Sequence, residues 1–141
     1  MPARTKDVEP ALIVYLAGVG YGDTVTPEDL MDRIAAGGKV LRIRRIGGGA
    51  TRKTDEPRVS IQVYMLRDAD HPRAAHEVAF DIEDLVDALG SSAPVIEVPA
   101  EYGGGRVIFD SGSKDSGPVE LPWPDPAVQV VETLYRISTR R

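Results

Sequence analysis

The sequence has no cysteine and few aromatic residues: one Trp, two Phe and five Tyr among 141 residues. The lack of cysteine excludes a disulfide framework, thiolate zinc sites and a cysteine nucleophile. No stretch reaches the roughly 18 apolar residues that a membrane span needs, and residues 1–10 lack the apolar core of a signal peptide. We therefore expect a soluble intracellular protein without a membrane partner.

An excess of positive charge is also missing, because the net charge is −5. Nucleic-acid-binding modules usually carry an excess of basic residues, so the composition argues against sequence-specific nucleic-acid binding. The charge is unevenly distributed. Basic residues gather at Lys39, Arg42, Arg44, Arg45, Arg52, Lys53 and Arg58, and acidic ones follow at Glu77, Asp81, Glu83, Asp84 and Asp87. Two patches of opposite sign therefore occupy neighbouring elements.

The hydrophobic pattern predicts an α+β fold in a single domain over residues 1–141. Apolar residues alternate strictly over 58–66, as in a strand with one buried face, and they recur every three to four residues over 70–90, as in an amphipathic helix. Further helices are predicted at 8–17 and 26–37, and further strands at 40–46, 95–98, 106–110 and 127–138. The expected architecture is one mixed or antiparallel sheet of four to five strands with a long β-hairpin, packed against two main helices.

Two segments are predicted to be irregular. Residues 47–57, between the first two strands, exceed the about two to five residues of a tight hairpin connection, which favours a mobile loop or one ordered by a partner. Residues 111–126 are rich in proline, glycine and serine, so they are predicted to form a long surface loop or arm. Trp123 lies in this arm.

Two short strings imitate catalytic motifs, and both fail on spacing. The glycine-rich run 47–54 resembles a phosphate-binding loop, but Arg52 stands where glycine must precede Lys53, and a strand follows where a helix is required. The zinc-protease helix motif begins at His76, but Phe80 occupies its second ligand position. We therefore predict no enzyme activity, no cofactor and no metal site.

Several segments together resemble the tail terminator proteins of long-tailed bacteriophages. They are the helix DVEPALIVYL, the strand and glycine break VLRIRRIGG, the strand DEPRVSIQVYM, the helix AAHEVAFDIEDLVDAL and the final strand ending YRIS. The resemblance covers residues 7–89 and 128–138, and the segment 101–125 departs from the family pattern.

This resemblance implies a structural virion protein that is made in the host cytoplasm and assembles as a ring, expected to be a hexamer. The ring would cap the head-proximal end of the tail, stop polymerisation of the major tail tube protein, and offer a docking surface to a head completion or connector protein. DNA would pass through the ring without sequence-specific recognition.

A ring needs a heterologous interface, in which one patch of each subunit meets a different patch of its neighbour. The basic hairpin and the acidic helix would supply such patches. The candidate interface residues are Arg44, Arg45, Arg52, Lys53, Asp55, Asp81, Asp84 and Trp123.

Other classes of function stay open at this point. The chain could be another head-to-tail joining or tail completion protein of the same virion. It could also be an unrelated small α+β domain that binds a ligand or regulates a partner, or an enzyme whose site forms only between subunits.

Overall fold

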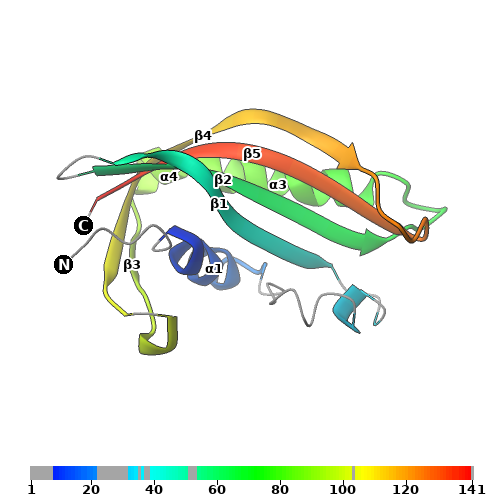
Figure 1. Cartoon of the computed structure of the whole chain (residues 1–141), viewed down its shortest axis with the longest axis horizontal. Helices are drawn as coiled ribbons and strands as arrows, with labels where there is room; N and C mark the ends of the chain where they lie inside the picture. The colour runs from blue at the N-terminus through cyan, green and yellow to red at the C-terminus, as the bar shows by residue number, and fades with distance from the viewer. Residues whose placement is uncertain are drawn as a thin grey trace.

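Five strands form one curled antiparallel sheet in the order β1-β2-β5-β4-β3 (Figure 1). The computed structural model describes residues 8–21, 32–34, 36, 39–50, 54–102 and 104–140. The strands are β1 (Val40–Ala50), β2 (Thr54–Leu66), β3 (Val95–Glu97), β4 (Arg106–Leu121) and β5 (Val128–Arg140). The helices with described bounds are α1 (Val8–Gly18), α3 (Ala74–Asp87), α4 (Leu89–Ser92) and the 3-10 turn Ala100–Tyr102. The α+β prediction is confirmed.

The last strand, β5, lies at the centre of the sheet, between β2 and β4. Its residues alternate between the two faces, and so do those of β2, because successive side chains of a strand point to opposite sides. In the register of the two strands Val63 lies opposite Val131, and Tyr64 lies opposite Val130. Residues directly opposite each other share a face, so the register fixes which side chains meet.

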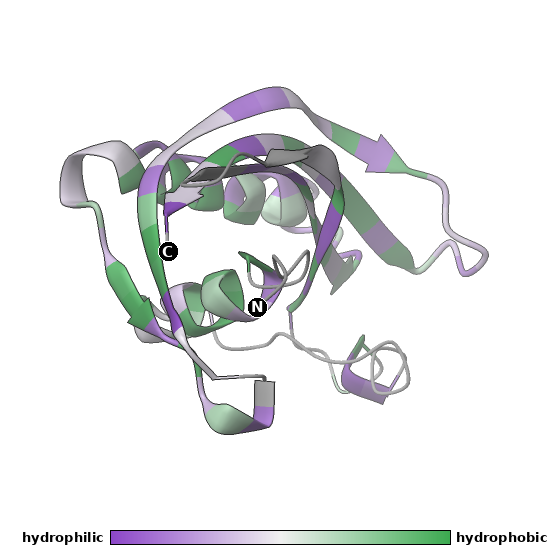
Figure 2. Ribbon diagram, turned by 60° about the vertical axis from the view of Figure 1, so that its left-hand side comes forward, coloured by the Kyte–Doolittle hydropathy of each residue, from purple (hydrophilic) through white to green (hydrophobic). Residues whose placement is uncertain are grey.

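One face of the sheet, here called the covered face, packs against α1 and α3. Figure 2 shows α1 lying within the curl of the sheet, with hydrophobic stretches on both helices. The helix α3 buries the stripe Ala75, Ala79, Ile82 and Val86, which recurs at the spacing of one helix face. The sheet contributes Leu41, Ile43, Val59, Ile61, Val63, Phe109, Val131, Tyr135 and Ile137 to this core.

The opposite side, here called the open face, is mostly polar. It carries Val40, Arg42 and Arg44 of β1, Arg58, Ser60, Gln62 and Tyr64 of β2, and Val128, Val130, Glu132, Leu134 and Arg136 of β5. At one end a small cluster of Ile34, Val40, Tyr64, Val128 and Val130 packs with Leu121 and Trp123. Among the described residues, we find no helix of more than one turn on this face.

The prediction of a long loop over 47–57 is wrong. The ladder between β1 and β2 continues to Ala50 opposite Asp55, with a register shift between Arg45 and Gly47. Gly48 makes the extension possible, because its φ is 105° and a Cβ there would lie 2.2 Å from the carbonyl oxygen of Glu56. The hairpin is therefore longer than predicted, and its connection is short.

The prediction of an irregular arm over 111–126 is also wrong for most of its length. Residues up to Leu121 belong to β4 and pair with β5. Register shifts near Asp110, Asp115 and Gly117 absorb the residues that suit a regular strand poorly. Only the residues between β4 and β5 are irregular.

The boundaries of the main helix also differ from the prediction. The helix α3 begins at Ala74 and ends at Asp87, and Gly90 lies inside the short helix α4 instead of ending α3. Most of the helix predicted at 26–37 falls outside the described residues. Within that range, residues 32–34 are described and are helical. In the described part of the chain, no helix is long and apolar enough to cross a membrane.

The strand β1 forms one edge of the sheet, and a carboxylate from α1 reaches it. The backbone N–H of Arg45 donates a hydrogen bond to Oε1 of Glu9 at 2.7 Å. This bond satisfies an outward-facing donor of the edge strand and ties α1 to β1.

Candidate functional site

Four arginines gather on the open face and form what we call the arginine surface: Arg42, Arg44, Arg58 and Arg136. Arg58 and Arg136 lie opposite each other on β2 and β5, and both pair with the carboxylate of Asp115. The side chains of Arg42 and Arg44 have no ion pair or hydrogen bond with any described residue. All the donors of these two guanidinium groups are therefore available to a partner.

The middle of the open face is held by a hydrogen-bond network around Glu132. The hydroxyl of Ser60 and the amide of Gln62 each donate to Oε2 of Glu132 at 2.8 Å. The Tyr64 hydroxyl donates in turn to Oε1 of Gln62. These bonds fix the polar side chains beside Arg42 and Arg44, so the surface is preorganised.

The other charged surface is the exposed side of α3, here called the acidic stripe: Glu77, Asp81, Asp84 and Asp87. These residues lie three or four positions apart, so they line one side of the helix, away from the core. Among them, Asp81 accepts a hydrogen bond from the Tyr21 hydroxyl at 3.1 Å. Partial burial and this hydrogen bond raise the pKa of Tyr21.

The structure separates two adjacent basic residues that the sequence suggested as one patch. Arg44 lies opposite Ser60 and points to the open face, where it is exposed. Arg45 lies opposite Val59, so it is on the covered side, and it is half-buried. Of these two residues, Arg44 belongs to the arginine surface and Arg45 does not.

The remaining basic candidates lie outside the described residues. These are Arg52 and Lys53, which lie between β1 and β2 in the sequence. Asp55 is in β2, where its backbone pairs with Ala50 on one side and Thr139 on the other. The acidic candidates Asp81 and Asp84 both lie in the acidic stripe.

Trp123 follows β4 and packs against the chain's own sheet. Its ring meets that of Tyr64 edge to face, with centroids 5.1 Å apart and an interplanar angle of 78°. The side chain is half-buried in the small cluster at the end of the open face. This contact is typical of stabilising aromatic pairs and accounts for the packing of the indole within the chain.

Sequence reasoning missed Arg42, Arg58 and Arg136 as candidates. Arg42 and Arg58 belong to the basic run of the sequence. Arg42 is two residues from Arg44, and Arg58 is two residues from Ser60, so strand alternation places each pair on one face. Arg136 is distant in sequence and joins them only because β5 pairs with β2. The alternation could have found the first two, whereas the third needed the strand order.

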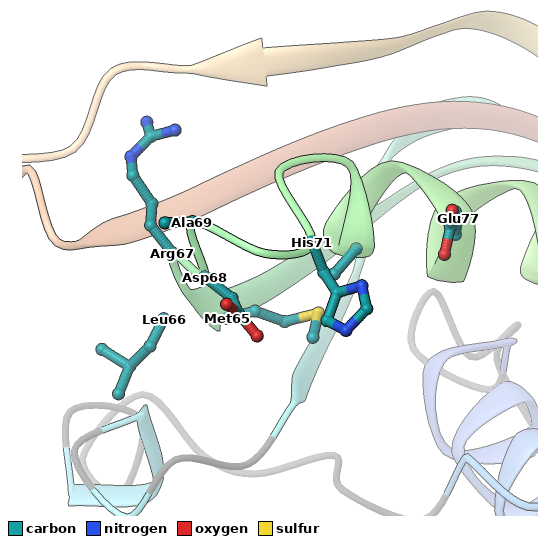
Figure 3. Close-up of a pocket in the computed structure, with 8 residues that line it drawn as sticks. Met65, Leu66, Arg67, Asp68, Ala69, His71 and Glu77 are labelled. Carbon is teal, nitrogen blue, oxygen red and sulfur yellow. The ribbon is translucent and has the colours of Figure 1, made fainter.

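A pocket of about 520 Å³ opens where β2 leads into α3 (Figure 3). Its lining comprises Met65, Leu66, Arg67, Asp68, Ala69, His71, Ala74 and Glu77. Figure 3 shows the imidazole of His71 beside Met65, whereas Arg67 points away. Arg67 pairs with Glu120 at 2.9 Å, and this bond, together with one from Gln129, holds the pKa of Glu120 below its ordinary value.

The ionisable side chains that line this pocket are Arg67, Asp68, His71 and Glu77. Within the described ranges, no group of three or more His, Cys, Asp or Glu side chains could hold a metal ion. The main features that stand out are thus two charged surfaces on opposite sides of one sheet. Comparison of the chain with protein-family models and with curated proteins finds no match.

Proposed function

We propose that this protein is the tail terminator of a long-tailed bacteriophage. It would form a ring, expected to be a hexamer, on the head-proximal end of the tail tube. There it would stop polymerisation of the major tail tube protein and present a docking surface to a head completion or connector protein. The role is structural and needs no catalytic residue.

The observation that carries the proposal is the contrast between the two sides of the subunit. The arginine surface lies on the open face, and the acidic stripe lies on a helix that packs on the covered face. Because the sheet separates them, they do not meet within one subunit. They are suited to meet between subunits, where charges of opposite sign favour correct pairing and speed association.

Contacts between two different surfaces are heterologous, and they close into a ring when the rotation between subunits allows it. A ring is what a cap on a tube requires. The resemblance of residues 7–89 and 128–138 to tail terminators supplies the identity of the tube.

The experiment is to mix the purified protein with self-assembling tail tube subunits and to measure tube length by electron microscopy. We expect shorter tubes with a ring at one end. The variant R42E/R44E should lose this capping. The variant R67E, which reverses a charge just after β2 at a residue that pairs with Glu120 away from the open face, should keep it. Tubes of unchanged length with the wild-type protein would contradict the proposal.

The same experiment addresses a second role in the same virion. A protein that leaves tube length unchanged but binds the isolated head connector would be a head-to-tail joining protein instead of a terminator.

A further inference from the structure

Each of the two charged surfaces has an exposed apolar side chain at its centre. On the acidic stripe this is Phe80, which is 43% exposed. Glu77 and Asp84 stand one turn before and after it, so carboxylates flank the ring along the helix. A large exposed aromatic side chain surrounded by charges is typical of an interface anchor.

The open face has a matching centre. Leu134 lies opposite Ser60 of β2, and Ser60 in turn lies opposite Arg44 of β1. Val119 of β4, which is 54% exposed, lies opposite Glu132, two residues from Leu134 on the same face of β5. Along β5 the same-face neighbours of Leu134 are Glu132 and Arg136, and Arg44 lies in the same row two strands away, on β1.

We propose that Phe80 of one copy seats on Leu134 and Val119 of the next copy, with its flanking carboxylates against Arg42 and Arg44. This inference rests on the proposed function, because it names the contact that would build the ring. Each surface carries an exposed apolar side chain, and the charges of Arg42 and Arg44 are opposite in sign to the acidic stripe. The carboxylate of the open face, Glu132, already accepts hydrogen bonds from Ser60 and Gln62. The occupant of the open face is therefore a second copy of this chain.

The two parts of the contact have different physical roles. Burying the Phe80 ring supplies most of the affinity, because apolar area leaves water at the centre of the interface. The charges around it lie nearer the solvent, so they set orientation and salt dependence more than affinity. Each subunit uses both surfaces at once, as a ring requires.

The first test replaces the apolar anchor and measures self-association by sedimentation velocity over a range of concentrations. F80S should raise the dissociation constant at least tenfold, which corresponds to a loss of about 1.4 kcal/mol. The control is V95S, which removes a side chain of similar exposure, 52%, from β3, away from both surfaces. V95S should associate like the wild type.

The second test reverses the charges. R42E/R44E and E77R/D84R should each associate more weakly than the wild type. Combining the four substitutions in one chain restores opposite signs at every contact, so association should recover. Circular dichroism of each variant checks that the fold is kept, which is expected because these side chains lie on the surface.

Four results would overturn the inference. The first is a wild-type chain that stays monomeric up to about 1 mM, the weak end of specific association. The second is F80S that associates like the wild type, and the third is a four-fold variant that does not recover. The fourth is F80S that keeps self-association but loses binding to the tail tube, because the occupant would then be the tube protein. Self-association that depends on Phe80 in a protein that does not cap tubes would contradict the proposed function alone.

Discussion

The two faces of the sheet differ in what surrounds them. On the covered face, Leu12, Phe109 and Tyr135 are completely buried between helices and strands. On the open face, the corresponding positions of the same strands hold arginines, a glutamate and its hydrogen-bond donors. The alternation of a single strand such as β2 thus separates the apolar residues of the main core from polar residues that are held by hydrogen bonds and ion pairs within the open face.

This division predicts that substitutions on the covered face change stability and that those on the open face change association. The largest effect is expected from Leu12→Ala, because it leaves a cavity in the core and should cost about 2 to 5 kcal/mol of unfolding free energy. Leu134→Ala on the open face should cost about 1 kcal/mol or less, since Leu134 is only half-buried. Urea denaturation of both variants measures the difference, and equal losses would contradict the division.

The close packing of α3 on β4 offers a second test of the covered face. A Cβ at Gly112 would lie 2.7 Å from both Cγ1 and the carbonyl oxygen of Val86. Gly112→Ala should therefore destabilise the protein by about 1 to 3 kcal/mol, as overpacking does. Gly90→Ala is the matched control, because its nearest neighbour would be 3.6 Å away and alanine favours helix. Thermal denaturation that shows no difference between them would contradict the packing.

A third prediction concerns alkaline pH. Burial on the covered face raises the pKa of Tyr135 above the ordinary value of 10.0. The unfolded chain therefore loses this proton first, so the stabilisation is complete below pH 10.0 and declines as the pH rises toward the folded-state pKa. The slope should be about 1.4 kcal/mol per pH unit.

The variant Tyr135→Phe keeps the ring and removes the titrating group, so it should lose most of this slope. The pKa of Tyr21 is also raised, so Tyr21→Phe should remove part of the slope. This part should be smaller, because Tyr21 is only half-buried. Urea denaturation at several pH values provides the measurement. If the unfolding free energy of Tyr135→Phe fell with pH as steeply as that of the wild type, a group other than Tyr135 would be responsible.

The smallest effect on stability is expected on the open face. R42E/R44E should change the unfolding free energy by no more than about 0.5 kcal/mol, because neither arginine has a partner among the described residues. The same variant is the one expected to lose tube capping. A melting temperature lowered by many degrees would show that the arginines hold the fold and would remove the contrast between the faces.

The parts of the fold that the sequence predicted are those in which local pattern and tertiary packing agree. In β2 and α3, apolar residues recur at the period of the element, so the pattern identified both. In β4, glycine, proline and serine indicated a loop, but pairing along β5 outweighs their poor strand preference, and bulges accommodate them. The predicted hairpin was too short for the same reason. Glycine at position 48 indicates a break in the strand, but its positive φ lets the β1–β2 pairing continue.

The candidate site was predicted only in part. Charge counting found the basic and acidic elements, because both are continuous in sequence. It joined Arg44 with Arg45, although alternation places them on opposite sides of β1. Arg136 could not be found, since its place beside Arg58 depends on the strand order. Surfaces built from distant strands need the topology, whereas a helix face needs only its period.

The hydrogen bond between Glu9 and the backbone N–H of Arg45 affects how readily another strand could pair with the edge of this sheet. An exposed edge strand offers its free amides to any other strand and can start fibrous aggregation. Here a carboxylate already occupies one of these donors on β1. A foreign strand would have to displace it and leave a negative charge facing the new partner. We therefore expect Glu9 to hinder the pairing of a foreign strand at this position of the β1 edge.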